Sequence, residues 1–378
     1  MKPAKVVHLS SVHSAFDTRI FHKECKSLAR AGYQVVFVVP HDKDEVVDGV
    51  RIKAVPKPRK RLSRMTKTAW KVYREAVRQK ANVYHFHDPE LIPVGLILKA
   101  RGKRVVYDMH EDTSKVLFSR DYLPSCLRPF LSRLAESAEN TTAGFFSCLV
   151  AATPSIAERF TARNRYVVVL HNFPRLQELA PTTDGQWNLR AHSVAYVGGL
   201  DANRGIRELI AAMDLLPEGL NATLKLAGEF SLPSFGEELA RLPGWRRVQM
   251  SGLVDREGVA RTLGNVRAGL VPFLPEPNHI EAMPQKFFEY MSAGIPVIAS
   301  DFPLWRKIIE GAGCGLLVDP SSPRAIADAI HFVLTRPQEA EAMGRRGREA
   351  VEKRYNWESE EKKLLEIYAD LVNSSCAA

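Results

Sequence analysis

Short β-branched runs alternate with segments of helical periodicity along almost the whole chain, and this alternation constrains the fold more than any other feature. Parallel strands need a crossover connection, usually a helix, and their sheets are covered on both faces, so their strands are almost continuously apolar. The pattern therefore predicts an α/β protein built from two successive series of βαβ units. The predicted strands are 5–9, 33–39, 51–55, 83–87, 104–109, 145–151 and 166–170 in the first series, and 193–198, 222–228, 248–253, 268–273, 296–300 and 315–319 in the second.

Helical segments are predicted between most of these strands, at 20–31, 63–80, 90–100 and within 113–141, then at 204–216, 235–242, 256–265, 284–293, 304–310, 323–335 and 338–354. The 378 residues exceed the 250–300 at which a single core stops growing, so two domains are expected. The polar, proline-bearing stretch 171–192 reads as a linker between them. We therefore place an N-terminal domain at 1–180 and a C-terminal domain at 181–356, followed by an amphipathic helix from 357.

The net charge of +10 is unevenly distributed, because residues 1–189 carry an excess of thirteen positive charges and the remainder is slightly acidic. The segment 51–80 holds twelve bases and one acid, Glu75, which predicts an anionic partner. Its helical part has one apolar face, so it could dock on anionic lipid. The alternative is that this face packs on the sheet and the bases are only solvated. No recognition motif supports nucleic acid as the partner.

Several functional classes are disfavoured. The five cysteines are scattered, with no CxxC and no Cys/His pair at metal-binding spacing, so neither a disulfide framework nor a structural zinc site is expected, and a reducing cytoplasm is favoured. No segment has the length of a signal-peptide core or a membrane-spanning helix. No P-loop and no GxGxxG follows a strand, which argues against kinases and dinucleotide oxidoreductases. Asp42 and Asp44 form an Asp-x-Asp, but its charged surroundings favour a solvated loop over a metal site.

The chemistry is expected at the carboxyl ends of strands, where open α/β sheets bind ligands. The stretch 277–301 follows a predicted strand and holds two carboxylates, Glu281 and Glu289. Pro284 suits the first turn of a helix, which places Glu281 before that helix and Glu289 inside it. Glu289 lies in an otherwise apolar run, where a carboxylate needs a partner such as a ligand hydroxyl.

The predicted start of this helix also suggests an anion site. The backbone N–H groups of Ala282, Met283 and Gln285 would face an anion at the positive end of the helix dipole. Lys286 in the first turn opposes the usual acidic preference there, which is consistent with compensation of a bound phosphate. A solvated lysine is the simpler alternative for Lys286 considered alone.

Glu281 and Glu289, followed by SAGIPVIASD, resemble the E-x7-E signature of glycosyltransferase family 4, the group 1 retaining glycosyltransferases. The similarity extends to VAYVGGLDANRGIRELIAAM, KLAGEF, MSGLVDREGVARTL and GCGLLVDP in the second half, and to FDTRIFHKECKSLARAGYQVVFV, YHFHDPELIPVG and VVYDMHED in the first. The resemblance implies a GT-B fold, with two Rossmann-like doubly wound domains facing a cleft. It also implies that the terminal helix, 357–378, returns to the N-terminal domain.

The resemblance assigns roles to residues of the C-terminal domain. Glu289 would bind the nucleotide ribose, Glu281 the hydroxyls of the donor sugar, and Arg204 the donor diphosphate. The family usually has a second base five residues before Arg204, where this chain has Gly199. We hypothesise that Lys286, with the helix start at Met283 and Gln285, supplies the missing charge.

In the N-terminal domain, His110 matches the histidine that reaches the donor sugar in similar enzymes. His85 and His87, at and beyond the end of another strand, are candidates for the acceptor side, although both could be satisfied core groups. Asp17 and Arg19 lie in the loop that replaces the family's glycine-rich turn and could also meet the acceptor.

The implied function is transfer of a sugar, with retention, from a UDP- or GDP-linked donor to a hydroxyl of a glycan. The expected acceptors are polyprenyl-diphosphate-linked intermediates of surface polysaccharides such as lipopolysaccharide. The resemblance implies neither a cofactor nor a metal. The enzyme would be cytoplasmic and peripheral at the inner face of the membrane, bound through 51–80. The alternatives are a sugar-nucleotide 2-epimerase of the same fold and a catalytically silent glycan-binding protein.

Overall fold

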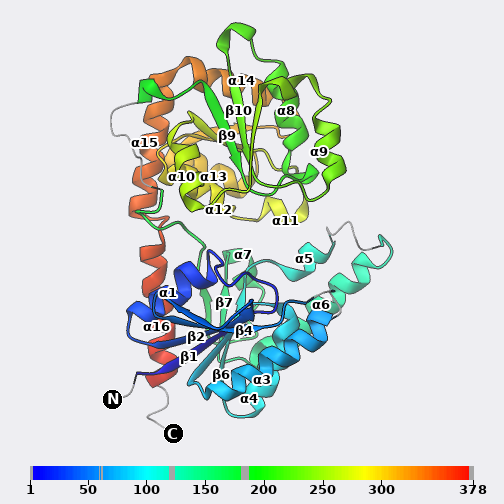
Figure 1. Ribbon diagram of the computed structural model, residues 1–378, viewed down its shortest axis with the longest axis vertical. Helices are drawn as coiled ribbons and strands as arrows, with labels where there is room; N and C mark the ends of the chain where they lie inside the picture. Colours follow the sequence, from blue (N-terminus) through cyan, green and yellow to red (C-terminus); the bar gives the residue numbers. More distant parts are fainter. Residues whose placement is uncertain (1–2, 59, 61–62, 119–123, 180–186, 374–378) are drawn as a thin grey trace. The chain divides into compact units, whose positions relative to one another are not determined.

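The computed structural model describes residues 3–58, 60, 63–118, 124–179 and 187–373, and it divides into two compact units (Figure 1). The N-terminal unit contains the chain up to Asn172 together with residues from Glu358 onward, and the C-terminal unit is Phe173–Trp357. The division thus falls at 172/173, against a predicted boundary near 180. Part of the predicted linker, 180–186, and the last five residues of the predicted terminal helix lie outside the described residues, as do Arg59 and Arg61 of the basic segment.

The N-terminal unit is built on an eight-stranded sheet in the order β3-β4-β2-β1-β5-β6-β7-β8, parallel except for β3. Strands β1, β2, β5, β6 and β7 are buried along most of their length, which explains their almost continuously apolar sequences. They are β1 (Lys5–Leu9), β2 (Gln34–Pro40), β3 (Glu45–Val47), β4 (Val50–Val55), β5 (Val83–Phe86), β6 (Arg104–Met109), β7 (Cys148–Ala151) and β8 (Val167–Val169).

Strand β3 was not predicted from the sequence. It pairs antiparallel with β4 through the turn at Asp48 and Gly49, which have φ angles of 50° and 80°. An Asp-Gly pair with positive φ at both residues is the usual two-residue hairpin connection. The charged sequence around it hid this short edge strand, whose Val46 is 66% exposed.

Helices cover both faces of this sheet. Alternate residues of each strand point to opposite sides, so the apolar side chains on both faces need to be covered. Val7 and Tyr84 contribute to the core beneath α3 and α4, whereas His8 and His85 point to the other face, where Tyr368 of α16 contacts both (α16 is red in Figure 1). The helical elements are η1 (Ile20–Cys25), α1 (Lys26–Arg30), η2 (Arg64–Thr68), α3 (Ala69–Gln79), η3 (Pro89–Leu91), α4 (Ile92–Ala100), α5 (Thr113–Phe118), α6 (Arg128–Thr142), η4 (Ala143–Phe145), α7 (Pro154–Glu158) and α16 (Trp357–Asn373).

The C-terminal unit has a six-stranded parallel sheet in the order β11-β10-β9-β12-β13-β14. The order reverses at β9, whose neighbours are β10 and β12, and such a switch point is where doubly wound sheets bind ligands. The strands are β9 (Ser193–Val197), β10 (Thr223–Ala227), β11 (Val248–Gly252), β12 (Ala268–Val271), β13 (Val297–Ser300) and β14 (Gly315–Val318).

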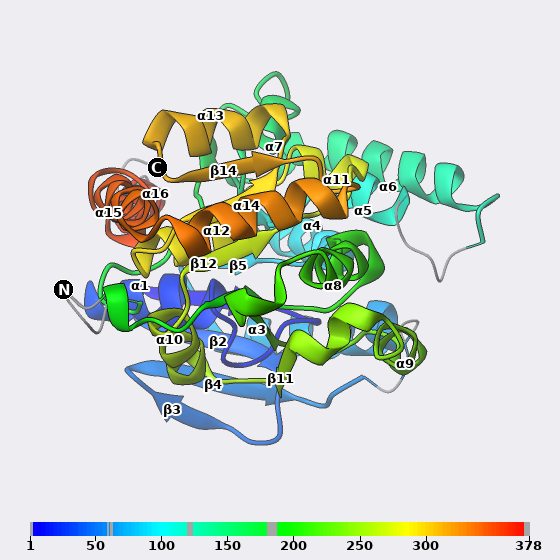
Figure 2. The same cartoon turned by 90° about the horizontal axis from the view of Figure 1, so that it is seen from above.

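Its helices also lie on both faces, and Figure 2 shows α13 and α14 on opposite sides of β14. They are α8 (Ile206–Asp214), α9 (Pro233–Leu239), α10 (Arg256–Gly264), α11 (Pro277–Ile280), α12 (Gln285–Ser292), α13 (Pro303–Ala312), α14 (Pro323–Thr335) and α15 (Pro337–Lys353). Among the described residues, no helix combines the length and apolar character needed to cross a membrane. The four described cysteines, which exclude Cys376, are unpaired.

Candidate functional site

The loop that follows β9 brings the backbone of two strands together at the switch point. Gly198 has a φ of 130° and Gly228, at the end of β10, has a φ of 153°, which disfavour any residue with a side chain. A Cβ atom on Gly228 would collide with the carbonyl oxygen of Gly198. The two loops therefore approach as closely as their backbones allow, and the N–H groups of Gly198 and Gly228 donate to the carbonyls of Ala227 and Gly252, both at 2.8 Å.

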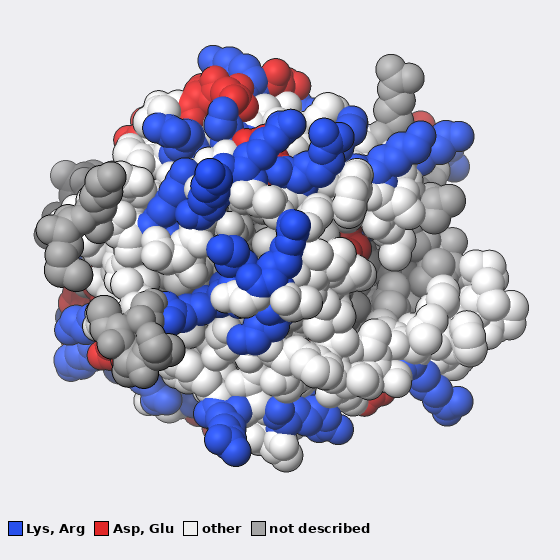
Figure 3. All heavy atoms as spheres, turned by 90° about the horizontal axis from the view of Figure 1, so that it is seen from below, with Lys and Arg blue, Asp and Glu red and all other residues white. Residues whose placement is uncertain are grey.

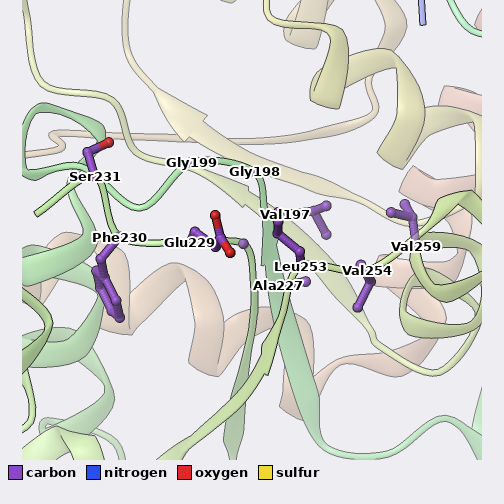
Figure 4. Close-up of a pocket in the computed structure, with 11 residues that line it drawn as sticks. Val197, Gly198, Gly199, Ala227, Glu229, Phe230, Ser231, Leu253, Val254 and Val259 are labelled. Atoms are coloured by element: carbon purple, nitrogen blue, oxygen red, sulfur yellow. The ribbon is translucent and has the colours of Figure 1, made fainter. Parts of the chain in front are cut away.

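A pocket of about 390 Å3 opens beside these glycines (Figure 4). It is formed by the ends of β9, β10 and β11 and by the start of α10. Its lining residues are Val197, Gly198, Gly199, Ala227, Gly228, Glu229, Phe230, Ser231, Leu253, Val254 and Val259. Glu229 and Ser231 supply the side-chain oxygens of a lining that otherwise consists of glycines and apolar side chains, which suits a flat, partly polar group such as a nucleobase.

Lys286 is the second residue of α12, and its ammonium group lies next to the glycine loop. A Cβ on Gly198 would be 3.0 Å from the Lys286 Nζ. The lysine is buried, and among the described residues its Nζ finds no hydrogen-bond partner, although it lies 3.9 Å and 4.9 Å from the ring centroids of Tyr196 and Phe273. Burial, and then the charge of Arg204, lower its pKa well below the ordinary value.

Arg204 ends the 3-10 turn Ala202–Arg204 and lies near the same aromatic rings as Lys286. Its guanidinium carbon is 5.2 Å from the ring centroid of Phe273, and its Nε is 3.4 Å from Asp201 Oδ2. The structure thus brings the two predicted diphosphate-binding cations to the same end of the sheet. Two cations this close repel each other, and an anion between them would remove the repulsion.

Glu289 lies inside α12 and is only 6% exposed. Its Oε1 accepts hydrogen bonds from Arg256 Nη1 at 2.7 Å and from Gln285 Nε2 at 3.0 Å. The sequence predicted a partner for this carboxylate, such as a ligand hydroxyl. In the structure, Arg256 and Gln285 are hydrogen-bond partners of its Oε1. Arg256, which also donates to Glu178 Oε1 at 2.7 Å, was not among the predicted site residues.

The entry into α12 differs from the prediction at one point. The N–H of Ala282 donates to the carbonyl of His279 at 3.2 Å, so it is not the free donor we expected. The reason is the short helix α11, which was not predicted and whose last turn uses this N–H. Pro284 is the N-cap of α12, one residue before its predicted place, while Glu281 lies at the end of α11 with an exposed side chain.

In the N-terminal unit, His110 follows β6 and is held by a buried carboxylate. Its Nε2 is 2.9 Å from Asp108 Oδ2 and 3.1 Å from His87 Nδ1, and its side chain remains 18% exposed. Burial alone would raise the pKa of Asp108, but the guanidinium of Arg19 and the imidazole of His110 hold it well below its ordinary value. His110 is thus a partly accessible imidazole on a fixed, charged support.

Arg19 and His87 are almost fully buried, at 3% and 2% exposure. Arg19 donates to both oxygens of Asp108, at 3.2 Å and 2.8 Å, and to the carbonyl of Leu170 at 2.8 Å. Burial lowers the pKa of His87 to about 4, which makes this imidazole neutral. Both side chains therefore support His110 through Asp108 rather than lining an open surface.

Asp17 is more accessible. Its Oδ1 accepts the N–H groups of Arg19 and Ile20 at 2.8 Å and 2.9 Å, and its Oδ2 is 3.2 Å from His13 Nδ1. Burial acts against the ionised form, but these hydrogen bonds and His13 lower the pKa of Asp17. Asp17 is therefore an ionised carboxylate that fixes the turn leading into η1.

Two groups of described side chains place potential metal ligands within 4.8 Å of one another. One contains His87, Asp108 and His110; the other contains four buried side chains, His8, Glu24, His85 and His87. The Asp-x-Asp pair is different, because Asp42 lies 2.9 Å from Lys57 Nζ and Asp44 lies 2.5 Å from Lys53 Nζ. These lysines neutralise the two aspartates.

Two family models match the chain in succession. Residues 18–172 match the glycosyl transferase 4-like domain, and residues 184–350 match the glycosyl transferases group 1 domain. The chain belongs to the group 1 glycosyltransferases. Most of the predicted donor-site residues lie within the second match, and Asp17 is the one predicted acceptor-side residue just outside the first.

Curated relatives are distant. An uncharacterized glycosyltransferase of Methanocaldococcus jannaschii is 28% identical over 46% of this chain, and the match spans 44% of that relative's length. The D-rhamnosyltransferase WbpZ of Pseudomonas aeruginosa is 25% identical over 74% of this chain and 70% of its own.

Solved glycosyltransferase structures establish the GT-B fold. A sucrose-phosphate synthase from Thermosynechococcus elongatus has a TM-score of 0.77 at 22% identity, covering 98% of this chain and 100% of its own. Anabaena HepE in complex with UDP and glucose has a TM-score of 0.74 at 15% identity, covering 97% and 100%. WaaG, a glycosyltransferase involved in lipopolysaccharide biosynthesis, has a TM-score of 0.72 at 16% identity, covering 95% and 98%.

Proposed function

We propose that the protein transfers a sugar, with retention, from a nucleotide-diphosphate sugar to a hydroxyl of a lipid-linked glycan. The observation that carries the donor half of this proposal is the buried ammonium of Lys286 beside the loop at Gly198. A buried cation without a hydrogen-bonding partner is costly, and an anionic ligand is the natural way to offset that cost. HepE, which has the same fold, was solved with UDP, and this supports a nucleoside diphosphate as that anion.

The pocket beside Gly198 is suited to the base of the nucleotide, and the proposed diphosphate position lies between Lys286 and Arg204. Glu289 would accept the ribose hydroxyls, with Arg256 fixing the orientation of its carboxylate. Glu281, whose side chain is exposed, would contact the hydroxyls of the donor sugar.

The chemical step requires stabilisation of the charge that develops on the leaving diphosphate. Lys286 and Arg204 would supply this stabilisation in a setting where fixed charges act strongly. We propose that no metal ion is needed at the diphosphate, so UDP affinity should be the same with and without Mg2+. His110 would hold the donor sugar, because Asp108 fixes its ring and leaves it partly exposed.

The acceptor half of the proposal rests on surface charge. Figure 3 shows a face on which Lys and Arg side chains are spread and few Asp or Glu interrupt them. On α3 and the residue that follows it, the apolar face packs on the sheet while Lys71, Arg74, Arg78 and Lys80 are exposed. Trp70 in the same helix is 54% exposed. Bases with an accessible tryptophan suit an anionic membrane, where a polyprenyl-diphosphate acceptor would be located.

The test is incubation of the purified protein with a panel of labelled UDP- and GDP-sugars, with and without lipid-linked acceptor. Transfer of label to the lipid fraction with one donor supports the proposal. Conversion of a donor into an isomeric sugar nucleotide without acceptor would identify an epimerase instead. Glycan binding without turnover of any donor would identify a silent binding protein.

A further inference from the structure

Three histidines and a glutamate form a closed cluster inside the N-terminal unit. His8 comes from β1, His85 and His87 from β5 and the residue after it, and Glu24 from the π-helical segment η1. His8, His85 and Glu24 are completely buried and His87 is 2% exposed. The cluster lies on the side of the sheet opposite α3, and the function proposed above does not use it directly.

The inner atoms of this cluster converge. His8 Nδ1 is 2.9 Å from His87 Nε2, and these two atoms lie 3.8 Å and 3.9 Å from Glu24 Oε2. One ligand atom from each of the four residues fits within a mutual distance of 4.8 Å. The ligands of a tetrahedral ion bound at 2.0–2.1 Å are about 3.3 Å apart, and the three measured separations lie on either side of that value.

The outer nitrogens of the same imidazoles face oxygen atoms. Tyr368 Oη is 3.0 Å from His8 Nε2 and 2.8 Å from His85 Nδ1, and Asp108 Oδ2 is 3.2 Å from His87 Nδ1. Each ring can therefore carry its proton on the outer nitrogen and donate it to an oxygen. The inner nitrogens then keep their lone pairs, which is the arrangement found for histidines that bind metals.

The inner side of the cluster lacks protons to satisfy these lone pairs. Among the described residues, the two oxygens of Glu24 have no hydrogen-bond partner, and the Nε2 of His85 has none either. Arg19 Nε lies 2.9 Å from Glu24 Oε1, but its N–H is directed to Asp108. Arg19 thus donates to Asp108, and the two oxygens of Glu24 are left without a donor among the described residues.

We propose that His8, Glu24, His85 and His87 bind a divalent transition-metal ion, zinc being the best match. Three imidazoles and one carboxylate suit zinc and its neighbours in the first row, whereas magnesium and calcium prefer oxygen ligands. The ion would connect β1, β5 and η1, and through the Tyr368 hydroxyl it would fix α16. It is a structural site in the N-terminal unit, separate from the diphosphate position in the C-terminal unit.

The first experiment measures metal on the full-length chain, purified without a polyhistidine tag and without chelator. Elemental analysis should find close to one zinc or related ion per chain. The protein is then stripped with a chelator and titrated with Co2+, which gives intense visible absorption bands when its coordination is tetrahedral. The bands should saturate at one equivalent, and added zinc should abolish them.

Thermal unfolding supplies a second readout. Zinc at a thousandfold excess over its dissociation constant should raise the Tm of the stripped chain by about 8 °C or more, and Mg2+ should not. Glu24→Gln should lose the cobalt bands. His331→Gln, at an exposed position on α14, is the matched control and should keep them.

The cobalt titration of the unsubstituted chain decides the matter even if Glu24→Gln fails to fold. Visible bands that saturate at one equivalent support the site. A stripped chain that develops no such bands, and whose Tm zinc leaves unchanged, overturns the proposal and shows that the cluster is a hydrogen-bonded network of neutral side chains.

Discussion

Replacement of Lys286 by methionine should stabilise the ligand-free protein while it weakens donor binding. Methionine has nearly the length of lysine and no charge, so it can occupy the same space between Tyr196 and Phe273. In the ligand-free protein the ammonium is buried and finds no hydrogen-bond partner among the described residues. The substitution therefore separates the effect of the buried charge on the free energy of unfolding from its effect on donor binding.

The magnitude follows from two opposing contributions. An unsatisfied buried polar group costs about 1–3 kcal/mol, and more when it is charged. The contacts of Lys286 with the two rings, at 3.9 Å and 4.9 Å, return about 0.5–1 kcal/mol each. The variant should therefore gain about 1 kcal/mol in unfolding free energy, which raises the Tm of a unit this size by about 2–4 °C.

UDP binding should change in the opposite direction. Loss of a hydrogen bond to a charged group costs about 1.5–3 kcal/mol, which corresponds to about 10–150-fold weaker binding. Isothermal titration calorimetry with UDP measures this change, and differential scanning calorimetry measures the Tm. Lys307→Met, at an exposed position on α13, is the control and should alter neither quantity.

The stability gain should depend on pH. The pKa of Lys286 is lowered in the folded protein by burial and by Arg204, while Glu289 and Asp201 act in the opposite direction. Between that lowered value and 10.5 the unfolded chain binds a proton that the folded protein does not, so the contribution of Lys286 to stability improves as pH rises. The advantage of Lys286→Met should be largest below the lowered pKa and should shrink as the pH approaches 10.5.

Two results would refute this reasoning. One is a Lys286→Met variant that is less stable than the parent by 1 kcal/mol or more, because it would mean that the ammonium has partners in solution. The other is unchanged UDP affinity, which would remove Lys286 from the diphosphate site and leave the charge missing at Gly199 without a substitute.

Three further predictions concern other parts of the protein. Arg256→Gln should weaken UDP binding by about 10-fold or more, because Glu289 loses its 2.7 Å partner, and calorimetry measures this. His110→Ala should lower kcat for sugar transfer by at least about 100-fold with little change in UDP affinity, which labelled-donor assays check. Charge reversal at Lys71 and Arg74 should reduce flotation with anionic vesicles and leave UDP affinity unchanged. If the unsubstituted protein bound neutral vesicles as well as anionic ones, the proposed membrane role would be contradicted.

The sequence was sufficient to predict the two sheets, because buried parallel strands leave a strong local pattern. All six strands of the C-terminal unit overlap their predicted ranges, and α14 coincides with its prediction. The misses in the fold were short elements. Strand β3 and helices α7 and α11 have three to five residues each, too few for a periodicity to show.

The site was less accessible to sequence reasoning, because its partners are far apart in the chain. The pairing of Arg256 with Glu289 spans 33 positions, and no local pattern marks it. The pocket was not predicted for the same reason, because its lining residues are far apart in the chain. Many of them follow the ends of β9, β10 and β11, and this position at strand ends could have indicated a binding site. The cluster of His8, Glu24, His85 and His87 could not be predicted from the sequence. The alternation of side chains along β1 and β5 shows that these histidines point away from the core beneath α3, but it does not show which residues they contact on the other face.

The contact of Tyr368 with His8 and His85 has a consequence for synthesis of the chain. The N-terminal unit is discontinuous, since its first 172 residues and α16 are separated by the whole C-terminal unit. At about 5–20 residues per second, a ribosome needs roughly 10–40 s to make the intervening stretch and α16. During that interval the part of the first sheet that α16 covers is exposed, including His8 and His85, which Tyr368 contacts in the complete protein. The C-terminal unit must fold while this surface is uncovered. Emergence of α16, rather than of the first sheet, is therefore the event that completes the N-terminal unit.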